Sequence, residues 1–105
     1  MANYVLVYKG GGGMANDEAA RQKIMEAWGQ WFGSLGENLV DGGNPFGPSA
    51  AISANGSVSN SASSGLTGYS IIKGESLQAA TNAAKGCPVL ADGGSVEVYE
   101  TFPVM

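Results

Sequence analysis

Short apolar segments recur along the chain, and most of them have the composition of β-strands. Residues 4–8 (YVLVY) are β-branched or aromatic throughout, so both faces of this strand are apolar. A strand of this kind belongs to a sheet that is covered on both sides. Further strands are predicted at 37–41, at 68–73 (GYSIIK) and at 95–102 (SVEVYETF).

Apolar residues at spacings of three and four predict an amphipathic helix after the first strand. Its apolar stripe consists of Ala20, Ile24, Trp28, Trp31, Phe32 and Leu35. We expect Asn16 or Asp17 to cap this helix and Gly36 to end it. Gly29 and Gly33 share one face of the helix, where we expect them to let a neighbouring element approach closely.

A second helix is predicted over residues 76–85, followed by Gly86 as its C′ residue and by Pro88, which prevents continuation. The residues of this helix that we expect to face inward are Leu77, Ala80 and Ala84. The pattern therefore predicts two helices, one in each half of the chain.

The sequence pattern of residues 50–59 predicts a β-hairpin between the two halves of the chain. Ile52 and Val58 flank Asn55-Gly56, the favoured residue pair for a type I′ turn. The segment that follows, 60–65 (NSASSG), is small and polar, and we expect it to be mobile.

The predicted order is β-α-β, an inserted hairpin and a second β-α-β, forming one domain over residues 1–105. Two helices and four long strands match an α+β fold, namely a ferredoxin-like βαββαβ sandwich with both helices on one face of an antiparallel sheet. The other face would then be bare, although residues 4–8 are apolar on both sides. We therefore expect a homodimer in which the sheet faces of two copies cover each other.

Composition narrows the classes of function. The 105 residues are 44% apolar and only 13% charged, too apolar for a disordered tail, and no apolar run is long enough to span a membrane. A net charge of −4 argues against nucleic acid or a membrane surface as a partner. The chain has no histidine, which removes the usual general base and the commonest zinc ligand. Cys87 is the only cysteine, which together with the lack of a signal-peptide pattern favours the cytoplasm.

Three segments resemble a known family: LVDGGNPFGPSA at 39–50, LTGYSII at 66–72 and GCPVLADGGSVEVYE at 86–100. They resemble the YCII-related proteins, in particular the DGPF-type branch, over nearly the whole chain. The resemblance implies a ferredoxin-like fold that dimerises into an α/β barrel and, in a few relatives, activity on small aromatic or chlorinated substrates. The chain departs from the family where 60–65 replaces the DGPF segment, and it lacks the histidine of the His/Asp pair proposed as catalytic in some relatives.

Several motifs have structural interpretations that we prefer to functional ones. Gly10, Gly12 and Ala15 fit a phosphate-binding loop only loosely, because a hairpin rather than a crossover helix follows the second strand. Cys87 is expected to pack as a small hydrophobe, and Asp92 to form a turn with the two glycines after it.

The candidate ligand-binding residues are Asp41, Glu97, Tyr8 and Tyr69. Asp41 follows a predicted strand and precedes two glycines, where it can hold a ligand or bond turn amides. Glu97 alternates with Val96 and Val98, so it points toward the dimer side if those valines meet the helices. The structural alternative for Glu97 is a hydrogen bond between subunits or a solvated sheet edge. We expect the two tyrosines to line the same space as this carboxylate.

Two hypotheses for function follow. The first is a cofactor-free dimer that binds a small polar or aromatic molecule, with weak acid–base or lyase-like activity carried by Asp41 or Glu97. The second is a non-catalytic structural or interaction module. Trp28 and Trp31 are expected to belong to the core rather than to a ligand platform. Whether the protein is an enzyme stays open at this point; a concave pocket holding a carboxylate favours the first hypothesis.

Overall fold

Strand β1 (Ala2–Lys9) is an inner strand of the four-stranded antiparallel sheet formed by the described residues. The other strands are β2 (Leu39–Asp41), β5 (Leu66–Gly74) and β6 (Ser95–Glu100), and the order across the sheet is β2-β5-β1-β6. The computed structural model describes residues 1–10 and 18–104. The expected cap at Asn16 or Asp17, and the glycine motif beyond Gly10, lie outside this description.

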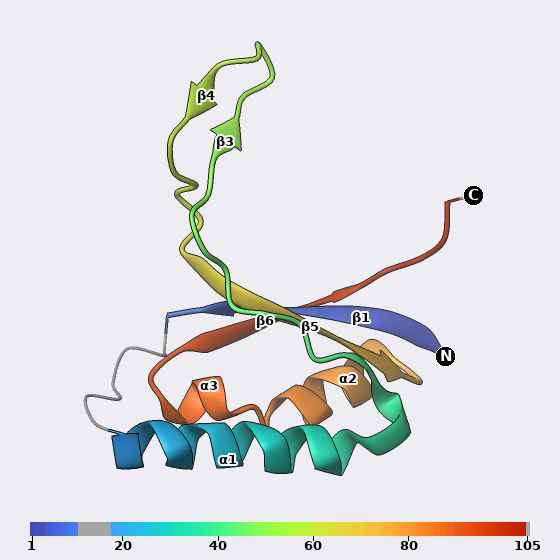
Figure 1. Ribbon diagram of the computed structural model, residues 1–105. Helices are drawn as coiled ribbons and strands as arrows, with labels where there is room; N and C mark the ends of the chain where they lie inside the picture. The colour runs from blue at the N-terminus through green and yellow to red at the C-terminus, as the bar shows by residue number, and fades with distance from the viewer. Residues whose placement is uncertain (11–17, 105) are drawn as a thin grey trace.

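In the described part of the chain, three helices pack on one face of the sheet (Figure 1), which makes the fold mixed α+β. They are α1 (Glu18–Leu35), α2 (Leu77–Ala84) and α3 (Pro88–Ala91). The sheet and the helices therefore form two layers.

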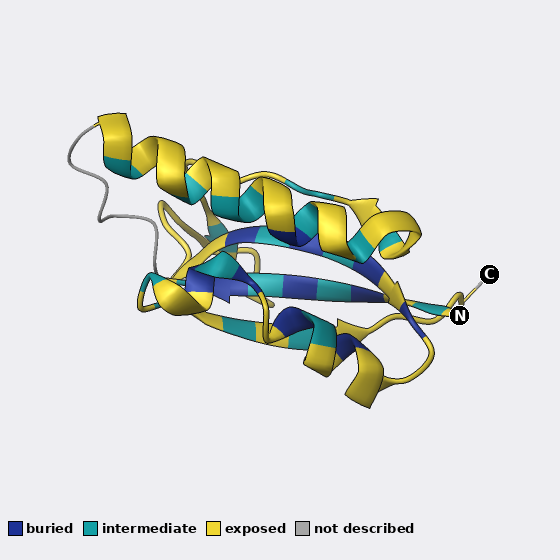
Figure 2. Cartoon of the chain, turned by 90° about the horizontal axis from the view of Figure 1, so that it is seen from below, coloured by how far each residue is buried: buried dark blue, intermediate teal, exposed yellow. Residues whose placement is uncertain are grey.

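Strand alternation gives the sheet a covered face and an open face. Tyr4, Leu6 and Tyr8 of β1 face the helices and are buried, as is Ile72 of β5. Figure 2 shows the resulting alternation of buried and intermediate residues along the central strands. The open face carries Val5, Val7, Tyr69, Ile71 and Tyr99, which the strand register places side by side. Among the described residues no helix covers this open face.

The ends of α1 and α2 follow local rules. Gly36 ends α1 with a φ of 54°, a backbone conformation that favours glycine. The expected strand at 37–41 is too long, because a 3₁₀ turn, η1 (Gly36–Asn38), continues the helix and β2 begins only at Leu39. Ser76 caps α2, its Oγ accepting a 3.0 Å hydrogen bond from the amide of Ala79.

Two expectations about helix packing are wrong. Leu77 is 49% exposed rather than inward, because it is the first residue of α2, whereas Ala80 and Ala84 are buried as predicted. Gly29 and Gly33 allow no close approach by any described part of the chain, since a Cβ added at either would meet nothing there within 4 Å. Their face of α1 is turned away from the sheet.

Helix α3 is an element that the sequence pattern missed. Pro88 does stop α2 from continuing, but it also occupies the first turn of a new short helix, where a missing amide hydrogen has no cost. Cys87 is the N-cap residue of α3 and is 3% exposed, which confirms the prediction that it packs as a small hydrophobe. The expected turn at Asp92 is confirmed, with Gly93 at a φ of 83°.

The predicted hairpin is present as β3 (Ala51–Ile52) and β4 (Val58–Ser59), but its turn differs from the type I′ expectation. A type I′ turn needs a positive φ at both central residues, and Gly56 has one whereas Asn55 does not. The Asn55 side chain instead accepts the amide of Ser57, which supports a wider loop. The final strand is also shorter than expected, because β6 ends at Glu100.

Candidate functional site

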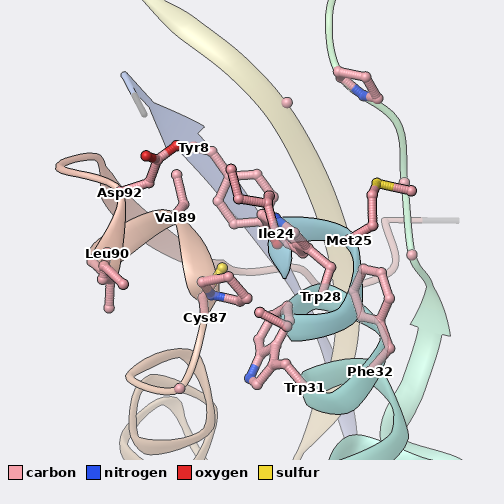
Figure 3. Close-up of a pocket in the computed structure, with 18 of the residues that line it drawn as sticks. Tyr8, Ile24, Met25, Trp28, Trp31, Phe32, Cys87, Val89, Leu90 and Asp92 are labelled. Carbon is pink, nitrogen blue, oxygen red and sulfur yellow. The ribbon is translucent and has the colours of Figure 1, made fainter. Parts of the chain in front are cut away.

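A cavity of about 1230 Å³ lies between α1, α3 and the covered face of the sheet (Figure 3). Its apolar lining includes Tyr8, Ile24, Trp28, Trp31, Phe32, Cys87, Val89 and Leu90. Helix α1 supplies one wall and the α3 region supplies the opposite wall, with Tyr8 from β1 between them. Among the described lining residues, the charged side chains are Lys23, Lys85 and Asp92.

Aromatic rings form the wall on the α1 side. The centroid of Trp28 lies 5.4 Å from that of Tyr8, 5.8 Å from that of Trp31 and 5.6 Å from that of Phe32. The spacing of three and four residues along α1 places these rings on one side of the helix. Edge-to-face and tilted pairs at these distances stabilise one another and present flat apolar surface to the cavity.

Trp31 fixes the position of α1 against the rest of the helix layer. It is 7% exposed, and its indole Nε1 donates a 3.1 Å hydrogen bond to the carbonyl oxygen of Ala83 in α2. A Cβ added at Gly86 would lie 3.1 Å from Cδ1 of Trp31, so a glycine there leaves room for the indole. The burial of Trp31 confirms it as a core residue. Trp28 and Phe32 are half-buried and pack against the same core, so the core expectation for Trp28 is confirmed only in part.

A chain of hydrogen bonds forms the polar floor of the site. The Tyr8 hydroxyl donates to Ser70 Oγ at 2.7 Å, and Ser70 Oγ donates to the Gly42 carbonyl oxygen, also at 2.7 Å. Burial raises the pKa of Tyr8 above its ordinary value of 10.0, and the hydrogen bond with Ser70 offsets part of this rise. Burial likewise raises the pKa of the Cys87 thiol. Both groups are therefore neutral at physiological pH.

Asp41 lies at the end of β2 and outside the cavity lining. Its Oδ1 accepts a 2.8 Å hydrogen bond from the amide of Gly43. This is the turn-forming role that the sequence offered as the alternative to ligand binding. Gly43 has a φ of 74°, and a Cβ there would lie 1.7 Å from the Tyr69 carbonyl oxygen, so Asp41 supports a turn that only glycine can make.

Glu97 and Tyr69 point to the open face, away from Tyr8. Val96 and Val98 pack against the core, as required for Glu97 to face the other side. Glu97 is exposed and accepts a 2.8 Å hydrogen bond from the Tyr99 hydroxyl, while the Tyr69 ring stacks on Phe46 at 5.8 Å.

The expectation that both tyrosines share one space with Glu97 is therefore wrong for Tyr8 alone, since Tyr69 and Glu97 lie on the open face on either side of Val7. Tyr69 pairs with Val7 across the sheet, so its side chain shares the face of Val7, opposite to that of Tyr8. Both residues border the cavity, but only the Tyr8 ring lies among its aromatic side chains. The structure thus places Tyr69 and Glu97 on the open face, Asp41 in a turn, and only Tyr8 in the aromatic wall of the cavity.

The sequence pattern did not predict the α3 side of the cavity, because α3 has only four residues. Val89 and Leu90 belong to this helix, and Asp92 is its C-cap residue. The signal that could have found it is Pro88 directly after a buried cysteine, since proline favours the first turn of a helix. Asp92 supplies the carboxylate that the ligand-binding hypothesis required of a pocket.

No protein-family model and no curated protein matches this sequence. Over residues 1–10 and 18–104, no helix has the length and apolar character needed to cross a membrane. Nor does that part of the chain bring together three or more His, Cys, Asp or Glu side chains in a way that could hold a metal ion.

Proposed function

We propose that the protein binds a small aromatic molecule in the cavity between α1, α3 and the sheet. The observation that carries this proposal is the aromatic wall of Tyr8, Trp28, Trp31 and Phe32 around a space of about 1230 Å³. Pockets for small molecules measure roughly 300–1,000 Å³ and are lined mainly by apolar and aromatic residues with few polar groups. A cavity slightly above this range is large enough for one or two rings with their substituents.

The charged residues of the lining favour an aromatic acid as the ligand. Lys23 and Lys85 are exposed on the helices, so a carboxylate can reach them while the ring packs inside. Asp92 is the one acidic residue among the described lining residues, so the two lysines give the lining a net positive charge. Flat rings of the protein offer stacking and edge-to-face contacts to a flat ligand.

Binding is a better description of this site than catalysis. Tyr8 and Cys87 are both neutral, and Tyr8 already donates its hydroxyl hydrogen to Ser70. Asp41 and Glu97, the carboxylates expected to act as acid or base, lie outside the cavity. The second hypothesis, a module without a ligand, makes the opposite prediction in the experiment that follows.

Thermal denaturation with benzoate, phenylacetate and 2-naphthoate tests the proposal. A ligand present at 100 times its dissociation constant stabilises the folded state by about 2.7 kcal/mol. We expect an aromatic acid to raise the melting temperature, its neutral amide to act more weakly, and Trp28→Ala to remove the effect. Leu77→Ala, on the exposed side of α2, is the matched control and should keep it. Failure of every aromatic acid at millimolar concentration contradicts the proposal.

We further propose that the chain has the ferredoxin-like fold of the YCII-related proteins. Each β-α-β unit is split: β5 lies between β1 and β2, and β1 lies between β5 and β6. This arrangement supports the assignment, as do the helices on a single face of the sheet. The buried free thiol of Cys87 supports a reducing compartment such as the cytoplasm.

We also propose that the open face forms a homodimer interface. The chain exposes 7132 Å², whereas a folded monomer of 10.6 kDa exposes about 5,500 Å². The excess is about twice the roughly 800 Å² that each partner contributes to a standard interface. Sedimentation at micromolar concentration tests this: we expect a dimer, weakened by Val7→Lys on the open face and unaffected by Leu77→Lys. A wild-type chain that sediments at 10.6 kDa contradicts it.

A further inference from the structure

The β3–β4 hairpin and its flanking segments project from the sheet as an extended arm (Figure 1), which we define as residues 47–65. At its base, the amide of Phe46 donates to the Thr67 carbonyl oxygen. Beyond that point β3 and β4 pair with each other through only two residue pairs. The projection contributes to a radius of gyration of 15.2 Å, against about 13 Å for a compact chain of this length.

An isolated two-stranded hairpin is at best marginally stable in water. This arm also exposes its apolar side chains, with Ile52 at 74% and Val58 at 65% exposure. Within residues 1–10 and 18–104 no further strand pairs with the outer edges of β3 and β4, and exposed hairpins usually protect such edges with charged residues, lysine in particular. A conformation with free edges and exposed apolar residues needs another surface to hold it.

The arm lacks the charges that a solvent-exposed hairpin carries. From Gly42 to Ile72 the sequence contains no Asp, Glu, Lys or Arg, and all the charged residues lie outside this segment. Depletion of charge is typical of the buried centre of a protein interface. The small polar residues that replace the charges give an uncharged surface suited to an apolar, uncharged partner surface.

We propose that the arm packs on a second copy of this chain, so that the two arms of the dimer clasp the partner subunits reciprocally. The arm rises on the side of the sheet away from the helices, which is the side of the open face (Figure 1). In a two-fold dimer each contact occurs twice, so both arms are covered together. The inference rests on the proposed homodimer and adds the arm to its interface.

The surface areas favour a second copy as the occupant. The sheet and the arm are exposed together, and the chain carries an excess of about 1,600 Å² over a compact monomer of its mass. Two copies together carry an excess of about 3,200 Å², which lies within the roughly 2,000–5,000 Å² that obligate dimers bury in total, so one symmetric contact that covers both surfaces accounts for it. The apolar residues of the open face and those of the arm then share one interface.

Sedimentation of the full chain carrying Ile52→Ser and Val58→Ser tests the contribution of the arm. We expect the dissociation constant of the dimer to rise at least about tenfold, because both side chains leave the interface. Leu77→Ser is the matched control, an exposed apolar residue on α2, and should leave the constant unchanged. A dimer that is equally tight with the altered arm overturns the inference but leaves the proposed dimer standing. A monomeric wild-type chain overturns both.

Photo-cross-linking from the arm provides a second measurement that does not depend on a destabilised variant. Asn55→Cys at the arm tip can carry a benzophenone, since the native Cys87 is 3% exposed and stays unlabelled. We expect light to yield a covalent dimer at twice the chain mass, whereas a probe at Gln22→Cys on the exposed side of α1 yields none. Cross-links confined to single chains, in a sample that sediments as a dimer, overturn the arm contact.

Discussion

The Tyr8 hydroxyl lies 2.7 Å from Ser70 Oγ and donates a hydrogen bond to it. This bond joins the neighbouring strands β1 and β5 beneath the aromatic cavity. Ser70 is fully buried, and its Oγ donates a second hydrogen bond to the Gly42 carbonyl oxygen in the loop after β2. Three separate segments of the chain are therefore tied together at the floor of the proposed ligand site. A buried polar group that loses its hydrogen-bond partner lowers the free energy of unfolding. The loss of stability therefore depends on which residue of this chain of hydrogen bonds is replaced.

We expect Ser70→Ala to destabilise the protein more than Tyr8→Phe does. Ser70→Ala leaves both the Tyr8 hydroxyl and the Gly42 carbonyl oxygen without their partner, at a cost of about 1–3 kcal/mol. Tyr8→Phe removes one bond but lets Ser70 keep its acceptor, at a cost of about 1 kcal/mol. Urea denaturation gives both free energies of unfolding. A neutral Ser70→Ala variant would show that the chain of bonds contributes nothing.

Gly86→Ala and Gly29→Ala should change stability in opposite directions. A Cβ at Gly86 lies 3.1 Å from Trp31 Cδ1, so the indole must shift and we expect a loss of about 1–3 kcal/mol. A Cβ at Gly29 meets nothing within 4 Å, and alanine favours the helix by about 1 kcal/mol. Thermal or urea denaturation of the two variants measures the difference. Stabilisation by both changes would show that Trp31 is free to move.

Stability should fall in alkaline solution. Burial raises the pKa of both Cys87 and Tyr8 above their ordinary values of 9.0 and 10.0, so the unfolded chain loses these protons first. Each contribution to stability is complete at neutral pH and is lost as the pH rises past the ordinary value, by up to about 1.4 kcal/mol per pH unit. Urea denaturation from about pH 8 to about pH 11 measures this slope. Tyr8→Phe should flatten it above about pH 10, and an unchanged slope would contradict the assignment.

The two candidate carboxylates should have no part in ligand binding. Asp41 accepts the amide of Gly43, and Glu97 accepts the Tyr99 hydroxyl on the open face, so neither borders the cavity. We expect Asp41→Asn and Glu97→Gln to change the affinity for an aromatic acid by less than about twofold. Trp28→Ala should weaken it at least about tenfold. Calorimetric titration compares the variants, and a large loss with Glu97→Gln would place the ligand on the open face instead.

Local periodicity was enough to predict most of the covered face. The alternation in residues 4–8 gives Tyr4, Leu6 and Tyr8 one common face, and the structure buries all three. The apolar stripe along α1 was predicted in the same way, because helical spacing places Trp28, Trp31 and Phe32 on one side of the helix. This placement does not depend on which element packs against the helix. These features depend only on residues a few positions apart.

The site itself was decided by tertiary structure. Tyr8 and Tyr69 are separated by strand pairing, since Tyr69 pairs with Val7 and thus faces away from Tyr8. Asp41 became a turn residue because the close approach of Gly43 to the Tyr69 carbonyl oxygen defines the path of the loop. The cavity exists because α3 faces α1 across Tyr8. Periodicity along one segment carries no information about which distant segment lies opposite it. The sequence therefore predicted which side chains share a face of a strand or helix, but not which of these faces would enclose the cavity.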